Sequence, residues 1–517
     1  MNDYIGNTAN ENGSALMKVY EGVKHTEIVE EFILPDYLPD VKRIIRVDAR
    51  PKIDGKFIAS GKVEYEGDAV CTVLFCDGEN KLKTVTFTAP FSDAVELSDG
   101  DNECIANLIP APESISCRTL NPRRISLRLR IDTEVTVWCN RTFAPTLSGT
   151  YSEDTAEKKT RDVEVMKLIC AGESGLNASA DIEVDGALMP VDDIISCNVG
   201  MSFYECKGAE DRVLCRGEMP ITVFYRTDDE NGENYTVLFR KLPLAQVVGA
   251  EGVTDGYECM ARGSVDGVKF NVAENGFGEK RIIELDVSYR IYLNCVGKDK
   301  INVTEDIYAP GSETKAETEL REFCRLVKNT SRSFNVSKSF TVEELNIQGA
   351  EKIFELSAEP RITDVKKSTD GFKLSVSGVA PASAIVKKED GLFSTSFEVP
   401  FSVDIDADGV PDTFTYNADA ICTCSKGRLD GEKLFAEIEL QINLMVLGIS
   451  EVKVLKNAEF TEKNEEGERP QMRFFYPSPD ETLWSIGKHF GISQKSLCEA
   501  NGISGEKIPD MLVIPTK

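Results

Sequence analysis

Apolar and polar residues alternate along several stretches of this chain, and the clearest of them runs from Ile125 to Trp138. Ile125 and Leu127 are separated by a polar residue, and the pattern continues, which predicts a strand with one buried face and one solvent-facing side. The stretches Ile282–Cys295 and Leu434–Leu447 alternate in the same way and are rich in β-branched residues. Glycine, aspartate and asparagine lie between such stretches, where turns require them. The pattern predicts antiparallel β-structure.

Three further landmarks recur together with these strands, which indicates an internal repeat. They are a short helix or turn with paired apolar residues, a strand ending at a glycine, and a strand reaching a proline that an apolar residue follows. They are found at LPDYLPDVKRII, LMPVDDII and LNIQGAEKIF, at Gly61, Gly217 and Gly378, and at Pro90, Pro243 and Pro400. The period is about 155 residues, too long for a solenoid repeat, so each copy is predicted to be a domain.

Each copy is long enough to bury its own core as an antiparallel sandwich or open barrel. The predicted fold class is therefore mainly β, with three tandem sandwich-like or barrel-like repeat domains and a small module at the C-terminal end. The predicted segments are a polar tail at 1–24, copies at 25–149, 150–309 and 310–457, an acidic linker at 458–472 and a module at 473–517. A short helix is expected in the third copy, through Leu320, Phe323 and Leu326.

The stretch from Phe474 to Pro515 has a different pattern, in which a short strand leads into two helices and a closing strand. Leu483, Ile486 and Phe490 are spaced as one face of a helix. Gly491 ends this helix, Ser493 is a good N-cap for a second one, and Leu512 begins the last strand.

This order, with its Glu481-Thr482-Leu483 run, resembles a LysM module. The resemblance implies a shallow groove between the turn before the first helix and the turn before the last strand. The groove residues that it implies are Asp480, Glu481, Thr482, Leu483, Trp484, Asn501, Ile503, Pro509 and Met511.

Two positions depart from the LysM pattern. Asp480 stands where a turn glycine is usual, and Pro509-Asp510-Met511 replaces a second glycine. A Cβ at both edges and an extra carboxylate would narrow a groove for saccharides. Trp484 has two interpretations, an exposed residue that stacks on a ligand or anchors a protein, or a core residue.

Charge limits the classes of partner. Of the 517 residues, 28% are charged and the formal net charge is −28, which disfavours binding to nucleic acid or to an anionic membrane surface. From Pro470 onward acidic and basic residues balance, so the excess negative charge lies upstream of the module.

The fifteen cysteines are scattered singly, without the tight spacing of a secreted disulfide framework. They are predicted to be buried free thiols in a reducing, cytoplasmic environment. The first twenty residues show no signal-peptide pattern, and no apolar run is long enough for a transmembrane helix.

Catalysis is not predicted, and neither is a cofactor. The two histidines, His25 and His489, have no partners that would suggest a catalytic site. The weak metal candidates are Asp404, Asp406 and Asp408, which resemble half of a calcium loop. Because a bidentate acid is missing at the end of that loop, a hairpin turn is the better interpretation.

Three copies of a β-rich unit with LPDYLPDV-like openings, followed by one LysM module, resemble the SipL-type spore morphogenetic proteins of clostridial spore formers. In that family the protein is made in the mother cell and localises to the forespore surface. There its LysM module contacts the ATPase that forms the basement layer of the coat.

The resemblance implies a non-enzymatic scaffold or adaptor of spore-coat assembly, whose LysM module docks a coat morphogenetic protein. The alternative is a protein of the cell wall or spore cortex that binds peptidoglycan through N-acetylglucosamine. A third possibility, an enzyme with a site in the β units, lacks paired catalytic motifs.

Overall fold

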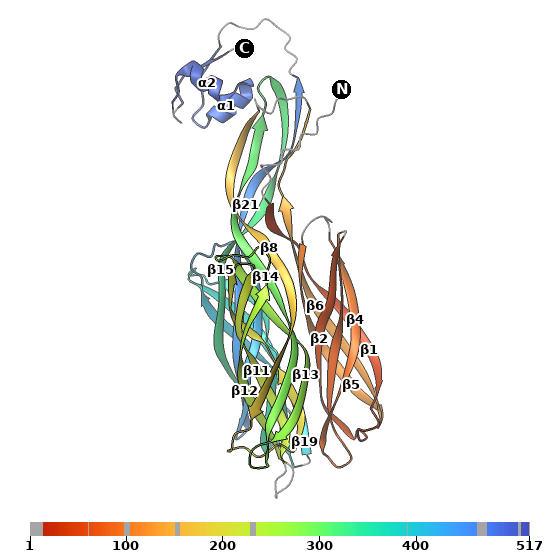
Figure 1. The fold of residues 1–517 in the computed structure, drawn as a ribbon. Helices are drawn as coiled ribbons and strands as arrows, with labels where there is room; N and C mark the ends of the chain where they lie inside the picture. Colours follow the sequence, from red (N-terminus) through yellow and green to blue (C-terminus); the bar gives the residue numbers. More distant parts are fainter. Residues whose placement is uncertain are drawn as a thin grey trace.

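The computed structural model describes residues 14–59, 61–97, 104–149, 156–227, 234–389, 391–462, 473–504 and 508–515. These residues form strands β1 to β23 and two short helices close to the C-terminal end (Figure 1). The prediction of a mainly β protein with a small βααβ module at its end is confirmed.

The first copy consists of six strands in two antiparallel sheets. They are β1 (Ser14–Ile33), β2 (Arg43–Ala59), β3 (Lys62–Cys76), β4 (Leu82–Glu96), β5 (Cys104–Asn121) and β6 (Arg124–Thr142). The sheets have the orders β1-β6-β5 and β2-β3-β4. Ile125, Leu127 and Ile131 on β6 are buried, as the alternation predicts.

The second and third copies repeat this order. Copy 2 contains β8 (Glu157–Glu183), β9 (Asp193–Val199), β10 (Ser202–Ala209), β11 (Arg212–Thr227), β12 (Asn234–Gly249), β13 (Glu258–Glu274) and β14 (Lys280–Tyr308). Copy 3 contains β15 (Ser312–Thr341), β16 (Lys352–Ala358), β17 (Arg361–Lys367), β18 (Lys373–Lys388), β19 (Gly391–Asp406), β20 (Phe414–Asp430) and β21 (Lys433–Glu462). In each copy the first strand pairs with the last strand, and the last strand pairs with the one before it.

The first strands of copies 1 and 3 are where the sequence-based prediction is wrong. Ser14 already lies in β1, so the polar tail ends before residue 14. The helix expected through Leu320, Phe323 and Leu326 is part of β15. Phe323 and Leu326 are buried in two different clusters. Because both faces of the strand are covered here, its apolar residues do not alternate, and their spacing imitates that of a helix.

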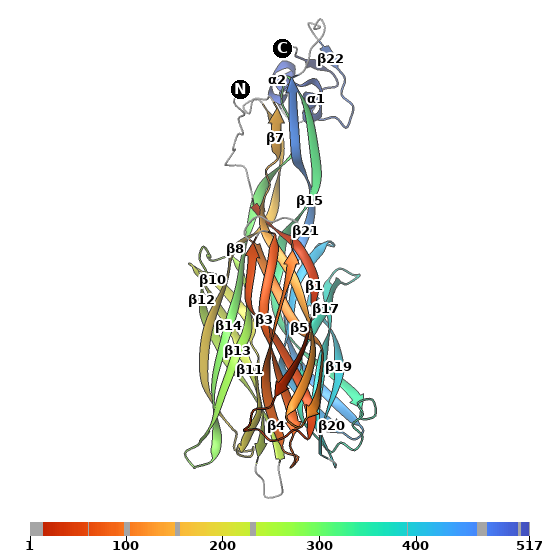
Figure 2. The same ribbon diagram turned by 90° about the vertical axis from the view of Figure 1, so that its right-hand side faces the viewer.

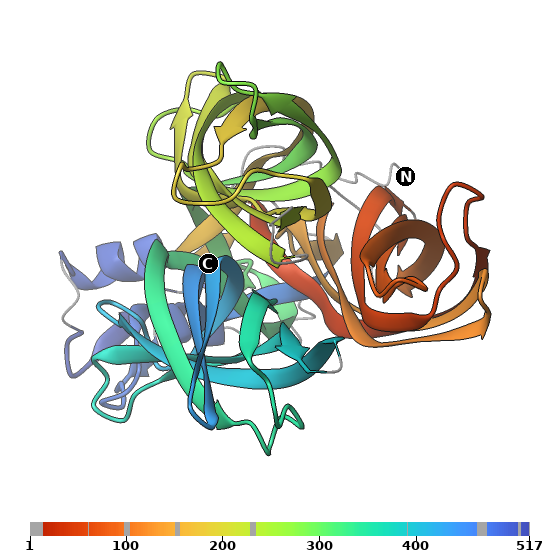
Figure 3. The ribbon, with the colours of Figure 1, turned by 90° about the horizontal axis from the view of Figure 1, so that it is seen from below.

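The three copies pack around a common axis, as Figure 3 shows from below. A buried apolar cluster lies at the centre and takes residues from all three copies. Its members are Leu74, Cys76 and Leu82 from copy 1, Ile195, Phe224 and Tyr235 from copy 2, and Ile385 and Leu392 from copy 3. Close by, Arg46 of copy 1 and Glu355 of copy 3 form a buried ion pair at 2.9 Å. The copies therefore form one body.

Two pairs of strands continue beyond this body as a stalk (Figures 1 and 2). We use the name stalk for residues 157–168 paired with 296–308 and for residues 312–326 paired with 447–462. Buried side chains such as Ile307, Leu455 and Phe460 fill its upper part. The linker predicted at 458–472 therefore begins later, because residues 458–462 belong to β21.

The end of copy 1 is attached to the stalk. Strand β7 (Thr146–Gly149) pairs in parallel with β21. Gly149 has a φ of 95°, and a Cβ built there would lie 2.0 Å from the carbonyl oxygen of Phe460. Only glycine fits this approach, since any side chain would separate the two strands.

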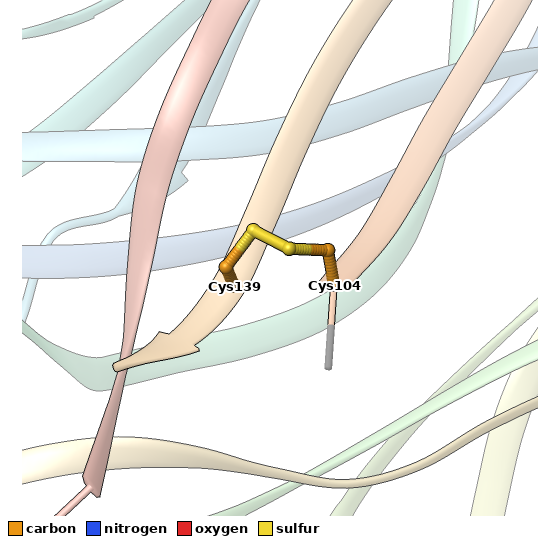
Figure 4. Close-up of a disulfide and its surroundings, with 2 residues drawn as sticks. All are labelled: Cys104 and Cys139. Carbon is orange, nitrogen blue, oxygen red and sulfur yellow. A yellow bond between two sulfur atoms is a disulfide. The ribbon is translucent and has the colours of Figure 1, made fainter. Parts of the chain in front are cut away.

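The expectation of free thiols is wrong for one pair. Cys104 on β5 and Cys139 on β6 lie opposite each other and form a disulfide (Figure 4). They are 35 residues apart in the chain, and only the pairing of the two strands brings them together. The other thirteen cysteines are free.

Candidate binding module at the tip of the stalk

The C-terminal module has the predicted order of elements. These are β22 (Arg473–Phe475), α1 (Leu483–Phe490), α2 (Gln494–Asn501) and β23 (Leu512–Ile514), with β22 and β23 antiparallel. Its core is formed by Ile486, Leu497, Leu512 and Ile514. Four apolar side chains from both helices and the closing strand thus hold the module together.

The helix ends follow the signals in the sequence. The side chain of Thr482 accepts a hydrogen bond from the amide of Ser485, and Ser485 reciprocates in a capping box. Gly491 ends α1 in the left-handed conformation, with φ 67°. Ser493 caps the start of α2. The role of Thr482 in the structure is therefore that of an N-cap.

Three further predicted groove residues, besides Thr482, have structural roles. The amide nitrogen of the Asn501 side chain donates to the carbonyl of Val513 (2.7 Å), and its oxygen accepts from the amide of Val513 (2.6 Å). These bonds tie α2 to β23. Leu483 and Ile503 pack against the core of the module.

Trp484 lies outside that core and contacts the stalk. Its indole N–H donates to the carboxylate of Asp306 at 3.0 Å, and its ring meets that of Tyr308 edge to face at 4.9 Å. One helical turn later, Lys488 forms an ion pair with the same carboxylate at 2.6 Å. Trp484 is therefore an anchor within the chain, which neither interpretation from the sequence included.

Further contacts extend this junction. The hydroxyl of Tyr308 donates to the carbonyl of Ile492 at 3.0 Å. The backbone and side-chain amides of Gln494 donate to the carboxylate of Glu157 at 3.1 and 3.2 Å. A Cβ on Gly487 would lie 2.4 Å from the Tyr308 hydroxyl, so glycine permits the close approach. The module is thus docked on the stalk by direct contacts of both its helices.

The junction also changes the ionisation of its groups. Burial by itself raises the pKa of Asp306. The hydrogen bonds that Lys488 and Trp484 donate, together with the positive charge of Lys488, outweigh this effect, so the pKa of Asp306 lies below its usual value. Burial raises the pKa of the Tyr308 hydroxyl. At neutral pH the junction therefore contains a carboxylate facing an ammonium group.

The remaining predicted groove residues lie on two loops that leave the sheet at the paired residues Phe475 and Leu512. In the first loop Asp480 is exposed, and Glu481 accepts a hydrogen bond from the amide of Ser478 at 2.7 Å. In the second loop Pro509 and Met511 are exposed. The contacts with the stalk described above involve residues 484–494 and none of these. Binding by the groove residues remains a prediction.

A signal that the sequence did not reveal is the apolar exposure beside these loops. Tyr476 is 71% exposed, Phe474 51% and Met511 43%. Tyr476 and Met511 directly follow and precede the paired strand ends, so both lie where the two loops diverge. Exposed aromatic and methionine side chains of this kind are enriched at protein interfaces.

Two of the three weak calcium candidates, Asp404 and Asp406, lie in ion pairs. Asp404 pairs with Lys373 at 3.1 Å, and Asp406 lies 3.7 Å from Lys328. Among the residues that the structure describes, no group of three or more acidic, cysteine or histidine side chains is arranged to hold a metal ion. Asp408 lies in a turn, as expected, but β19 pairs with β18 and β20 pairs with β21, so this turn joins two sheets and the expectation of a hairpin is wrong.

In the described part of the chain, neither helix is long or apolar enough to cross a membrane.

Comparison with protein families identifies two domain types in the chain. Residues 40–120 and 190–273 match the SipL, SPOCS domain, and residues 478–510 match the LysM domain. No curated protein and no solved structure matches the chain. The SPOCS matches lie in copies 1 and 2, and copy 3 has the same order of strands outside the matched ranges.

Proposed function

Since the chain is a SipL-type, sporulation-related protein with a C-terminal LysM domain, we propose that it is a non-enzymatic adaptor in spore-coat assembly. SPOCS and LysM domains are non-catalytic binding domains, and the LysM domain is of the type that binds peptidoglycan. In the proposed role, the LysM module docks a coat morphogenetic protein, the ATPase of the basement layer.

The observation that carries this proposal is the orientation of the module on the stalk. On α1, the side chains of Trp484 and Lys488 both bind the carboxylate of Asp306 on the stalk. Asp480 and Pro509 on the two loops, and the side chains of Tyr476 and Met511, stay exposed beyond this junction at the end of the stalk. Such an arrangement suits a protein that presents one binding surface at a distance from its bulk.

The chemistry of the open surface favours a protein partner over a glycan. Asp480 and Asp510 place carboxylates on the two loops, and Pro509 removes a backbone amide from the second one. Backbone amides are the donors that N-acetyl groups and sugar hydroxyls need. Tyr476 and Met511 add apolar area of the kind that anchors protein interfaces.

The test is a binding measurement with the full chain and the basement-layer ATPase of the same organism. Tyr476→Ala and Met511→Lys are expected to weaken binding by tenfold or more, on the order of 1.4 kcal/mol or above. Phe372→Ala is the matched control, because Phe372 is 69% exposed on copy 3, and it should bind like the unaltered chain. Leu483 and Trp484 are poor choices for this test, since they hold the module together or dock it.

Peptidoglycan binding is the second candidate, and the LysM match favours it. Sedimentation with purified peptidoglycan distinguishes the two. The adaptor role predicts that the full chain stays in the supernatant and that the same two variants change nothing. Strong retention that Met511→Lys abolishes would establish the glycan-binding alternative.

The proposed place of action is the mother cell, at the surface of the forespore. A fluorescent fusion of the full chain should form a shell around the forespore, and Met511→Lys should disperse it. A shell that persists in Met511→Lys would show that it does not depend on this surface of the module, and the Phe372→Ala control should keep the shell.

A further inference from the structure

Five cysteines lie in one row across copy 2. Cys259 is paired with Cys295 on the neighbouring strand, and Cys295 is paired with Cys170. On the other side of the row, Cys206 is paired with Cys215. The strands that carry them are five successive neighbours, in the order β11, β10, β13, β14, β8.

The two halves of the row meet between β10 and β13. Lys207 pairs with Glu258, so the next residues on these antiparallel strands, Cys206 and Cys259, lie opposite each other. All five cysteines belong to one side of the barrel wall, because Cys215, Cys259 and Cys295 are buried in the core of copy 2 and Cys170 and Cys206 pack against it. Residues directly opposite in a sheet are about 4.5–5.5 Å apart at Cα, which is within the reach of a disulfide.

The fold itself does not require cysteine at these positions. In each copy, a backbone amide just after the first strand donates a hydrogen bond to a carbonyl at the start of the last strand. The acceptors are Arg123 in copy 1, Arg281 in copy 2 and Glu432 in copy 3, and counting from them aligns the three last strands. By this alignment Cys295 corresponds to Val137 and to Val446. Those two valines pair with Ala106 and Tyr416, so the other copies fill the same site with ordinary side chains.

Copy 1 shows that this part of the ladder accepts a disulfide. Cys139 lies one inward-facing position beyond Val137, and it is bonded to Cys104 across β5 and β6. The pair Cys259 and Cys295 occupies the corresponding strands of copy 2, one position nearer to the body, and is not bonded.

We propose that the cysteine row of copy 2 is a redox-sensitive site that oxidises to two cross-strand disulfides, Cys206–Cys215 and Cys259–Cys295, and leaves Cys170 free. The bonds would link β10 to β11 and β13 to β14 covalently, so that these strands of copy 2 could not separate.

The electrostatics of the two pairs support this pairing. A hydrogen bond from Cys215 lowers the pKa of Cys206, and one from Cys295 lowers the pKa of Cys259. The pKa values of the two donors, Cys215 and Cys295, are raised. Each pair therefore has one thiol that ionises more readily and one that keeps its proton, and thiolate is the reactive form. Cys206 is also partly exposed, so a small oxidant can reach it.

A peroxide is the class of oxidant that the reaction needs. The thiolate of Cys206 attacks one oxygen of hydrogen peroxide, which releases hydroxide and forms a sulfenic acid. The thiol of Cys215 then attacks that sulfur, and the disulfide forms with release of one water. Overall each pair gives up two protons and two electrons, and each hydrogen peroxide becomes two waters.

The test starts from the full chain in which the five cysteines of the row are free thiols. The chain is titrated with hydrogen peroxide, alkylated and analysed by peptide mapping without reductant. We expect four of the thirteen free thiols to disappear, with linked peptides for the two pairs and full reversal by dithiothreitol. The oxidised chain should remain a single chain on a non-reducing gel and should unfold at a higher temperature.

Cys295→Val is the informative variant, because valine occupies this site in the other two copies and folding should be kept. It should lose only the Cys259 bond, two thiols instead of four should disappear, and part of the thermal shift should be lost. Cys498→Ser is the matched control in α2 and should keep both bonds.

Three results would overturn the proposal. The first is that all five thiols stay alkylatable after peroxide. The second is that bonds form between chains or with cysteines outside the row. The third is that the purified chain holds zinc at one ion per chain and that Cys295→Val releases it.

Discussion

The three copies in the body meet through buried apolar side chains, whereas the module meets the stalk mainly through polar groups around Asp306. At the centre of the body, side chains from all three copies share one apolar cluster, and the ion pair of Arg46 and Glu355 is buried with them. At the junction, the indole of Trp484 and the ammonium of Lys488 converge on one partly buried carboxylate.

The difference teaches which part of the molecule can separate. The free energy gained by burying apolar side chains is roughly proportional to the area removed from water. In a shared apolar cluster, exposing one side chain also exposes the surfaces of its neighbours. A junction that depends on one carboxylate can open while the body stays folded. Variants at the two places should therefore differ in what they unfold.

The largest effect is expected in the body, for Glu355→Ala. This change removes the copy 3 partner of the buried guanidinium of Arg46, which keeps only its ion pair with Asp48, and breaking a buried ion pair costs up to about 3–5 kcal/mol. Chemical denaturation of the full chain measures it. Glu64→Ala removes an exposed ion pair with Lys62, which water and salt screen, and should have a far smaller effect. Equal effects of the two variants would contradict the importance of the interface between copies.

The next effect is expected at the junction, for Trp484→Ala. It removes an edge-to-face ring pair worth about 0.5–1.5 kcal/mol and a hydrogen bond to a charged group worth about 1.5–3 kcal/mol. Hydrogen exchange should accelerate at Ile492 and Gln494 and stay unchanged in β6 and β14. Phe474→Ala, in the same module but away from the stalk, should leave the exchange at both residues as it was. Faster exchange throughout the body would show that the module is not separable.

Acid should open the junction through Asp306. Its pKa is lowered in the docked state, so the stabilisation is present above the ordinary pKa of an aspartate and is lost as the pH falls through the lowered value. Hydrogen exchange of α1 measured down the acid range should show this step. In Asp306→Asn the step should be absent; a step that persists would assign it to another group.

The smallest effect is expected at the turn with the aspartate series. Asp404→Asn breaks an exposed ion pair with Lys373 and should change the stability by about 1 kcal/mol or less. Calcium should leave the unfolding temperature of both the unaltered chain and the variant unchanged. A rise that only the unaltered chain shows would restore the calcium interpretation.

Local patterns in the sequence determined much of this molecule. The alternation from Ile125 to Ile131 predicted a strand with one buried face, and the structure has it in β6. The recurring turns and prolines revealed three copies. Thr482, Gly491 and Ser493 marked the helix ends correctly. Each of these signals acts within a few residues of where it appears, so one chain is enough to detect it.

The contacts between distant segments were decided by the tertiary structure. Ser14 is in a strand because β6 provides its partner. Phe323 is buried because side chains from β1, β8, β14 and β21 pack around it. The bond between Cys104 and Cys139 depends on the register of β5 and β6. Trp484 became an anchor because Asp306, far away in the chain, lies at the tip of the stalk. A sequence pattern records which face of an element is apolar, but the surface that covers this face is known only when the chain has folded.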